Sequence, residues 1–235
     1  MAHILITSGP TRAYLDDVRF LSNGSSGRMG AALAAAAIAA GHRVSVVSGP
    51  VSVPYPARAR VISVTTTREM LDACLAVLPD VDGVIAAAAP CDFEPAARQA
   101  GKIARQGRGL TLRLVPTVDI VATLVEQVRE RADLCRWFVA FALEVGADHA
   151  RAIAKLRRKQ CDLIVVNDLP AVDATRTAVC VLDHQGEVAA ATGTKGAVAR
   201  RLLKTIEKRL INPRGRQGGR ERRPPTITQP RGRAS

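Results

Sequence analysis

The chain has 235 residues, of which 47% are apolar and only 3% aromatic, and its formal net charge is +13. This length and apolar content suit one α/β domain or two small ones, with the Ala, Val, Leu and Ile core typical of helices packed on a parallel sheet. Residues 211–235 hold seven arginines and one glutamate, which leaves +7 for the preceding 210 residues. That milder excess is compatible with small anionic ligands and gives a nucleic-acid role little support.

Strands and helices are expected to alternate along most of the chain. The apolar run at 3–7 predicts a buried strand, and the Ala-rich run at 25–40 predicts a helix that ends at Gly41. The elements expected after it are strands 43–48 and 60–65, helix 68–77, strands 83–88 and 110–115, helix 118–131, strand 137–142, helix 147–159, strands 163–166 and 177–182, and helix 195–208. This alternation predicts a Rossmann-like, doubly wound α/β fold with a mainly parallel sheet.

The last segment has a different composition. Pro, Gly and Arg dominate after Ile211, and such a segment cannot bury enough apolar surface to offset its ordering entropy. We therefore expect one folded domain (1–210) followed by a disordered, Arg-rich tail (211–235), whose contacts with nucleic acid would be non-specific. No run of 18 apolar residues occurs, so we expect that the chain has no signal peptide and no membrane span. Five dispersed cysteines without a Cys-x-x-Cys pair indicate reduced thiols and a cytoplasmic location.

A glycine-rich loop lies between the first strand and the first helix. Gly24, Gly27 and Gly30 recur at a spacing of three, and the helix is expected to begin near Ser25. A helix start presents unpaired N–H groups and a partial positive charge, and glycine lets a phosphate approach that backbone closely. The loop therefore predicts a phosphate site, although glycines at this spacing can also serve packing alone. A binding loop by itself would not need the polar Asn23 and Arg19 just ahead of it.

Two features weaken the interpretation of this loop as a dinucleotide fingerprint. The loop from Gly9 to Gly24 is long, whereas a dinucleotide fingerprint turns tightly. The second strand is followed by Ser48-Gly49-Pro50, without the acidic residue that binds a ribose diol. A Rossmann-like oxidoreductase that binds NAD(P) or a flavin remains the alternative.

Several charged residues could complete an anion site, but each also has an ordinary structural explanation. Asp92 follows the strand at 83–88 and would lie at the crevice rim, or serve as a turn residue; Lys102 could reach a phosphate, or be a solvated loop charge. Lys155 and Lys159 share one helix face, where an anion could neutralise them. Phe141 could stack on a base or pack in the core. The four histidines show no metal-ligand spacing, so the metal ligands stay unknown.

These motifs, taken together, resemble those of one family, phosphopantothenate–cysteine ligase (phosphopantothenoylcysteine synthetase) of coenzyme A biosynthesis. The resemblance covers about residues 3–210 and keeps the family's order of motifs. It rests on Thr7-Ser8-Gly9-Pro10-Thr11-Arg12, on 18–30 with Arg19, Asn23 and the glycine loop, on 47–50, 86–92, Lys102, 118–121, Phe141 with Glu144, Lys155, Lys159 and Asn167-Asp168. The flavin-dependent decarboxylase half that often precedes this domain in bacteria is absent, so the chain looks like the free-standing form.

The resemblance implies a two-step reaction. The carboxylate of 4′-phosphopantothenate attacks the α-phosphate of CTP, pyrophosphate leaves, and the amine of L-cysteine then displaces CMP from the acyl-cytidylate. CTP and Mg²⁺ are the implied co-substrate and cofactor. Eukaryotic relatives use ATP, and Ala104-Arg105 after Lys102 and Pro90-Cys91 before Asp92 depart from the bacterial pattern beside the nucleotide. CTP is the expected nucleotide and ATP the alternative.

The resemblance also implies roles for single residues. Asn23 and Arg19 would handle the acyl intermediate, and Lys102 would stabilise charge during activation while also contacting the nucleotide. The family forms homodimers in which parts of one chain cover the partner's site, and we expect the same here. The implied nucleotide-binding positions are Ser25, Gly27, Ala86, Ala87, Ala88, Asp92, Lys102, Val118, Asp119, Ile120, Val121, Phe141, Lys155 and Lys159.

Overall fold

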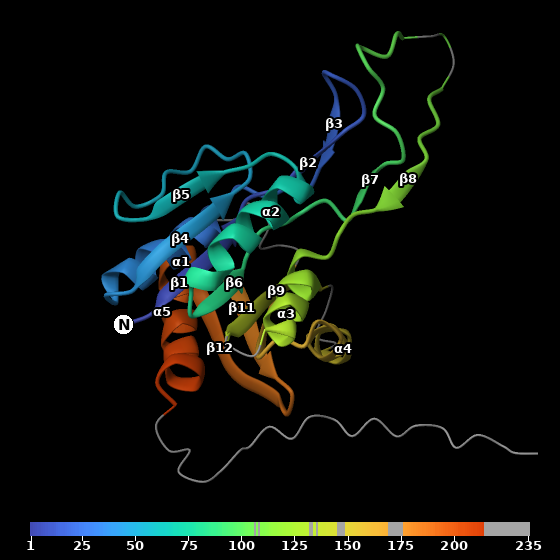
Figure 1. Cartoon of the computed structure of the whole chain (residues 1–235). Helices are drawn as coiled ribbons and strands as arrows, with labels where there is room; N and C mark the ends of the chain where they lie inside the picture. Colours follow the sequence, from blue (N-terminus) through green and yellow to red (C-terminus); the bar gives the residue numbers. More distant parts are fainter. Residues whose placement is uncertain are drawn as a thin grey trace, which may run out of the picture.

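A single eight-stranded sheet forms the centre of the molecule (Figure 1). The computed structural model describes residues 1–105, 107, 109–131, 134, 136–144, 149–168 and 176–213. Across the sheet the strands are β12 (Gly186–Thr194), β11 (Arg176–Asp183), β10 (Leu163–Asp168), β9 (Trp137–Glu144), β6 (Gly83–Ala86), β1 (His3–Ser8), β4 (Arg43–Ser48) and β5 (Arg60–Ser63). The six strands from β10 to β5 are parallel, and β11 and β12 add an antiparallel edge. The predicted mainly parallel sheet is confirmed.

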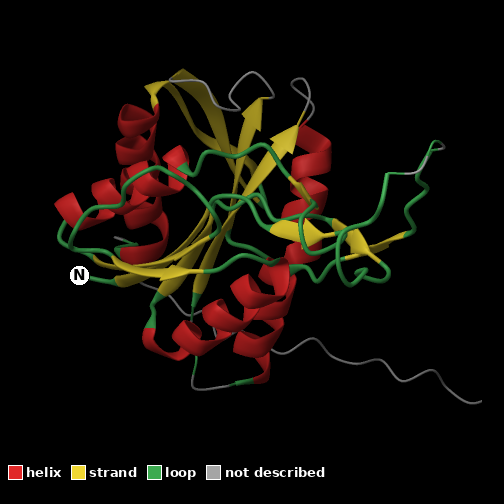
Figure 2. Ribbon diagram, turned by 90° about the horizontal axis from the view of Figure 1, so that it is seen from above, coloured by secondary structure: helices red, strands yellow, loops and turns green. Residues whose placement is uncertain are grey.

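Helices cover both faces of this sheet, as the view from above shows (Figure 2). One apolar core joins α1 and α5 to the sheet, and a second core on the other face joins α2, α3 and α4 to it. The helices are α1 (Arg28–Ala39), α2 (Thr67–Val77), α3 (Ile120–Glu130), α4 (His149–Lys159) and α5 (Lys195–Ile206), with short helical turns at η1 (Leu78–Asp80) and η3 (Glu207–Ile211). The fold is therefore doubly wound. No helix among the described residues is long and apolar enough to cross a membrane.

The strand order places a crevice between β1 and β6. After β1 the chain moves outward to β4 and β5, and then returns to the other side of β1 to form β6, β9 and β10. Ligands of open α/β sheets bind at such a reversal, beyond the carboxyl ends of the strands. The chain segments that follow β1 and β6 are therefore the first place to look for a site.

The first helix begins later than expected. It starts at Arg28, because the preceding residue Gly27 adopts a left-handed conformation (φ 71°) that does not belong to a helix. Its end matches the prediction: Gly41 (φ 86°) follows the helix, and the N–H groups of Gly41 and His42 donate to the carbonyls of Ile38 and Ala37. This is the usual way in which glycine closes a helix.

Gly30 allows α1 to lie directly against β1. A Cβ atom at this position would overlap the Oγ and Cβ atoms of Ser8. We expect Gly30→Ala to lower the free energy of unfolding by about 1–3 kcal/mol, the usual effect of overpacking. Urea denaturation measures this change. Gly107→Ala is the matched control, since a Cβ there meets no atom within 4 Å; an equal loss in both variants would contradict the packing explanation.

Two small ribbons form an arm that projects from the sheet (Figure 1). β2 (Arg12–Tyr14) pairs with β3 (Phe20–Ser22), and β7 (Phe93–Pro95) pairs with β8 (Leu114–Pro116). We call these two ribbons, with the described residues between β7 and β8, the arm. The prediction of a strand at 110–115 is therefore wrong in its bounds and in its place in the sheet. Only the last two of these residues lie in β8, which pairs with β7 outside the main sheet. The exposed Leu110 and Leu112 lie outside β8, because they have no core to pack against.

The C-terminal part brings further differences from the prediction. β12 was not predicted, although it forms a hairpin with β11 across a turn between Asp183 and Gly186. The last helix ends at Ile206 and continues as the π-helical turn η3. Residues 214–235 of the tail lie outside the described residues.

Candidate functional site

A cavity of about 810 Å³ lies at the reversal between β1 and β6. It is lined by segments that are distant in sequence but converge at the carboxyl ends of the parallel strands. These are Thr7, residues 23–30, 86–92, 117–121 and 140–143, and the single residues Lys155, Arg158, Lys159, Asn167 and Lys195. The volume falls within the range of small-molecule sites.

The glycine loop forms one wall of the cavity. Ser8 Oγ at the end of β1 donates a hydrogen bond to the carbonyl of Gly27 (3.2 Å), and the Tyr55 hydroxyl donates to Ser8 Oγ (2.8 Å). These bonds hold the loop against β1, so that the start of α1 at Arg28 faces the cavity. A helix start in this position can bind an anion through its backbone N–H groups.

The segment after β6 forms the opposite wall. The backbone N–H of Ala88 donates to Thr7 Oγ1 (3.2 Å), and the N–H of the buried Cys91 donates to Thr11 Oγ1 (2.9 Å). Asn23 Nδ2 crosses from the glycine loop to this wall and donates to the Pro90 carbonyl (2.8 Å). Asn23 is thereby held at the cavity rim, and the exposed Asp92 also lines the cavity.

The third wall comes from α3 and α4. Asp119 caps the start of α3, where its Oδ1 accepts hydrogen bonds from the N–H of Ala122 (3.2 Å) and from Lys159 Nζ (2.8 Å). Burial alone would raise the pKa of Asp119, but the hydrogen bond and the charge of Lys159 outweigh it and lower the pKa. The ion pair fixes the last residue of α4 at the cavity edge.

Fourteen of the sixteen site residues predicted from the sequence line this cavity, and Arg19 and Lys102 are the two that do not. Phe141 packs partly against the core and also lines the cavity, and its stacking on a base stays a prediction. Ser25 lies in the loop that leads to α1 and not in its first turn. The cavity thus brings these fourteen residues together, and their joint role stays a prediction.

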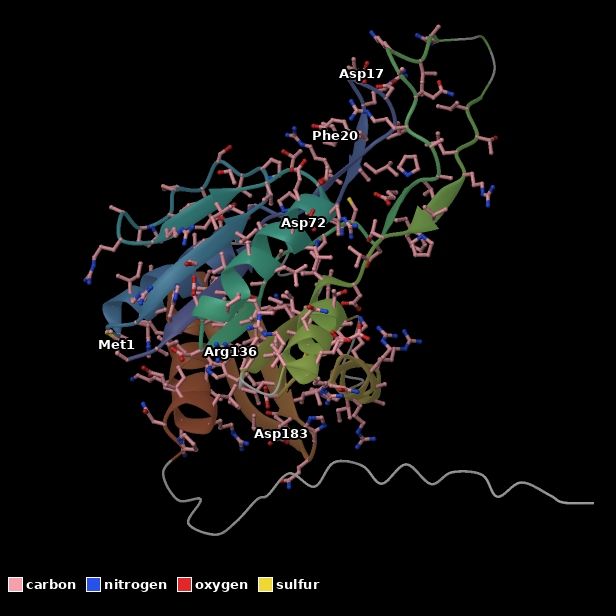
Figure 3. The ribbon with its side chains drawn as sticks, in the orientation of Figure 1. Met1, Asp17, Phe20, Asp72, Arg136 and Asp183 are labelled. Atoms are coloured by element: carbon pink, nitrogen blue, oxygen red, sulfur yellow. The ribbon has the colours of Figure 1, made fainter. Side chains whose placement is uncertain are left out.

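Arg19 and Lys102 belong to the arm. Arg19 Nε donates to Asp16 Oδ2 (2.9 Å), and the Arg19 guanidinium also donates to the carbonyl of Ile103, next to Lys102. The bond to Ile103 therefore ties Arg19 to the segment that carries Lys102, and neither residue lines the cavity of this chain. Figure 3 shows Asp17 and Phe20 on the same projection.

The buried carboxylate of Asp16 organises the arm. Burial would raise the pKa of Asp16, but hydrogen bonds from the N–H groups of Arg19, Val18 and Ile103 and from the Arg19 guanidinium hold the pKa well below its usual range. One carboxylate thus joins the turn between β2 and β3 to the segment that carries Lys102.

We expect Asp16→Asn to loosen the arm, because the charge that binds Arg19 is lost. Limited proteolysis within residues 96–113 should accelerate, while Glu94→Gln, at an exposed carboxylate of the same arm, should change it less. The wild-type arm should keep its protection at neutral pH. Because the folded-state pKa of Asp16 lies below the unfolded value of about 3.9, protection begins to fall below that value and is lost as the pH falls through the folded pKa. Equal cleavage of all three proteins would contradict this role.

Some lining residues were not predicted from the sequence. Arg28, Arg158 and Lys195 add positive charge to the cavity, and Thr117 Oγ1 donates to the Cys91 carbonyl (2.6 Å) behind its wall. Asn167 Oδ1 is buried at β10 and has no hydrogen-bond partner among the described residues. The sequence signal for the arginines was weak, since charges on a helix are usually solvated. Lys195 lines the cavity from the start of α5. The antiparallel hairpin that precedes α5 determines where this helix begins.

Known proteins are similar to this chain over most of its length. A family model described as "DNA/pantothenate metabolism flavoprotein C-terminal domain" matches residues 1–210. The coenzyme A biosynthesis bifunctional protein CoaBC of Vibrio vulnificus (strain YJ016) is 38% identical over 210 residues, which cover 87% of this chain and 51% of that protein. The chain spans about half the length of such curated relatives.

Solved structures give the same result. A crystal structure of the C-terminal domain of CoaBC shares 34% identity and a TM-score of 0.73, and the match covers 89% of this chain and 95% of that one. A Cab2 mutant in complex with phosphopantothenate-cysteine has the same fold, with 17% identity, a TM-score of 0.72, and 88% and 85% coverage.

The fold and the cavity define a Rossmann-like α/β domain with a cation-lined site at its topological switch point. Within that class, the chain belongs to the DNA/pantothenate metabolism flavoprotein C-terminal domain family.

Proposed function

We propose that the protein is a ligase of coenzyme A biosynthesis that joins 4′-phosphopantothenate to L-cysteine. One observation carries the proposal: a single cavity collects the glycine loop, Asn23, Asp92 and the Asp119–Lys159 pair, which are the motifs that resemble the ligase family. Membership of a family whose relatives include CoaBC supports it. The fold shared with Cab2, which was solved with phosphopantothenate-cysteine, is compatible with it.

The proposed reaction proceeds in two steps. The phosphopantothenate carboxylate attacks the α-phosphate of CTP, so that an acyl-cytidylate forms and pyrophosphate leaves. The cysteine amine then attacks the acyl carbon, CMP leaves, and the amine loses a proton. The start of α1 and the cations Lys155 and Lys159 would bind phosphates, and preorganised charges of this kind stabilise the transition state of phosphoryl transfer. Asn23 at the rim would orient the acyl group.

The residues also fit a divalent cation on the nucleotide. Mg²⁺ is bound by few carboxylates together with substrate phosphates, and Asp92 is an exposed carboxylate at the cavity rim. Asp119 is already engaged with Lys159. Asp92 would therefore hold Mg²⁺, which when bound neutralises charge on the triphosphate.

CTP is the proposed nucleotide, and ATP is the alternative. A Rossmann-like oxidoreductase is less compatible with the site, because residues 43–63, from β4 through β5, contain no Asp or Glu for a ribose diol. The described cavity instead offers several cations, as a triphosphate and a second phosphorylated substrate would require.

We also propose a homodimer in which the arm reaches the partner's cavity. The arm exposes large apolar side chains, with 57% of Leu110, 53% of Phe93, 41% of Leu114 and 40% of Phe20 accessible. Clustered exposure of this kind is typical of an interaction surface. Since Arg19 and Lys102 lie on the arm, a partner's arm would bring these cations to a cavity that lacks them.

The proposed activity is tested with the purified chain, phosphopantothenate, cysteine, Mg²⁺ and either CTP or ATP. We expect release of pyrophosphate and of CMP that depends on both phosphopantothenate and CTP, with phosphopantothenoylcysteine as the product. NADPH and flavin titrations serve as the control for the oxidoreductase alternative. No product with either nucleotide would overturn the ligase proposal, and AMP in place of CMP would reassign the nucleotide.

A further inference from the structure

Three metal-ligating side chains meet away from the cavity, on the sheet face that carries α4. They are His149 at the start of α4, Cys180 on β11 and Glu187 on β12, and their ligand atoms all lie within 4.8 Å of one another. None of them lines the cavity. His149 lies 31 residues before Cys180, whereas Cys180 and Glu187 are seven residues apart on neighbouring strands, so the spacing of the histidines gave no sign of the cluster.

The fold itself brings the three residues together. The β11–β12 register shifts between Val181 and Leu182, so that Leu182 lies opposite Glu187. A shift of this kind is a bulge, which redirects side chains at functional positions. α4 packs on β11 and places His149 over Cys180. Asp183, labelled in Figure 3, marks the nearby end of the same strand.

His149 supplies an independent observation. Its Nδ1 atom is inaccessible to solvent and has no hydrogen-bond partner among the described residues. Buried polar atoms are almost always satisfied, and a bound ion is one of the few explanations for an exception. A ring nitrogen in contact with a metal would need no such partner.

We propose that His149, Cys180 and Glu187 bind a Zn²⁺-class transition metal, with solvent as the fourth ligand. A set of one imidazole nitrogen, one thiolate and one carboxylate favours Zn²⁺ and excludes hard cations such as Mg²⁺, which need oxygen ligands. Tetrahedral zinc with bonds of roughly 2.0–2.3 Å separates its ligand atoms by roughly 3.4–3.8 Å. Small side-chain rotations within the observed 4.8 Å would reach that geometry.

The surroundings of Cys180 argue against a reactive thiol as the explanation. Burial raises the pKa of Cys180 to about 12, together with a hydrogen bond to Glu187 and the negative charge of that residue. The metal-free thiol is therefore protonated and a poor nucleophile.

The site would connect α4 to the antiparallel hairpin. His149 is the first residue of α4, and the same helix carries Lys155 and Lys159 to the cavity at its other end. Metal binding would therefore fix the helix that supplies these cations. This effect on α4 does not depend on the ligase activity.

The test titrates the full-length, untagged chain with Co²⁺ as a spectroscopic probe and then displaces it with Zn²⁺. We expect one equivalent of Co²⁺ with a thiolate-to-cobalt charge-transfer band and the intense d–d bands of a four-coordinate ion. Cys180→Ser should abolish the charge-transfer band. His149→Gln and Glu187→Gln should each weaken Zn²⁺ affinity by at least about tenfold. Zn²⁺ should raise the Tm of the wild type more than that of any variant.

Cys161→Ser is the matched control, because this cysteine is buried near the same helix but lies outside the cluster. It should keep the cobalt band. Glu187 is exposed, so its variant tests the site even if changes at Cys180 disturb folding, which circular dichroism would reveal. Absence of the thiolate band in the wild type would overturn the proposal. So would a band and an affinity that survive unchanged in the His149 and Glu187 variants.

Discussion

Asn23→Asp should still form the acyl-nucleotide but slow amide formation by about 100-fold, or about 2.7 kcal/mol. The amide Nδ2 donates to the carbonyl of Pro90 at the cavity rim, whereas a carboxylate has no donor and would repel that carbonyl. Rapid-quench measurements should therefore show one equivalent of pyrophosphate released in a burst, followed by slow appearance of phosphopantothenoylcysteine.

The control for this experiment is nucleotide binding. Asn23→Asp should bind CTP with an affinity close to that of the wild type, and Asn212→Asp, which lies outside the cavity, should change neither step. Complete loss of nucleotide binding in Asn23→Asp would show that Asn23 belongs to the phosphate-binding wall and has no part in the second step.

A mixture of two inactive variants should recover activity if the arm acts in the partner's site. Lys102→Ala removes a cation from the arm and Lys159→Ala removes one from the cavity, and each homodimer should lose at least about 100-fold in kcat. In dimers co-expressed at equal levels, half are hybrids, and each hybrid contains one site with neither substitution. Activity should then return to about one quarter of the wild-type value.

The same mixture distinguishes the alternative directly. If Lys102 serves the cavity of its own chain, every site in a hybrid carries one substitution and no activity returns. Light scattering on both variants provides the control, because a change that merely prevents dimer formation would also remove activity. Two dimeric variants that fail to complement would overturn the proposal that the arm acts in trans.

The fold could be predicted from the sequence where the signal is local, as it is for hydrophobic runs and glycine turns. The parallel strands at 3–7 and 83–88 are predictable because buried strands need nearly continuous apolar residues, although the second of them ends at Ala86; the strand at 43–48 is predictable from its alternating Val residues. β12 was missed because its residues 186–194 are small and mostly Ala, Gly and Thr, so that neither apolar content nor alternation identifies them. The antiparallel pairing with β11 stabilises this segment, and the sequence pattern does not contain that information.

The site was predictable in part for a related reason. Residues that follow strands, such as Asp92, must lie at one edge of a parallel sheet, and the cavity there includes them. The arm is different, because the buried Asp16 determines where Arg19 and Lys102 lie. A contact across more than 80 residues cannot be inferred from spacing. The His149, Cys180 and Glu187 cluster escaped notice because it depends on the pairing of β11 with β12 and on the packing of α4 on β11.

The cation-lined cavity has a kinetic consequence. Among its described lining residues, Arg28, Lys155, Arg158, Lys159 and Lys195 stand against Asp92 and Asp119, an excess of three positive charges. Such a field attracts a polyanion before contact, and dissolved salt weakens the attraction over about 10 Å at 0.1 M. Capture of a triphosphate would therefore slow steeply as ionic strength rises, whereas zwitterionic cysteine, with no net charge, would enter at a rate almost independent of salt.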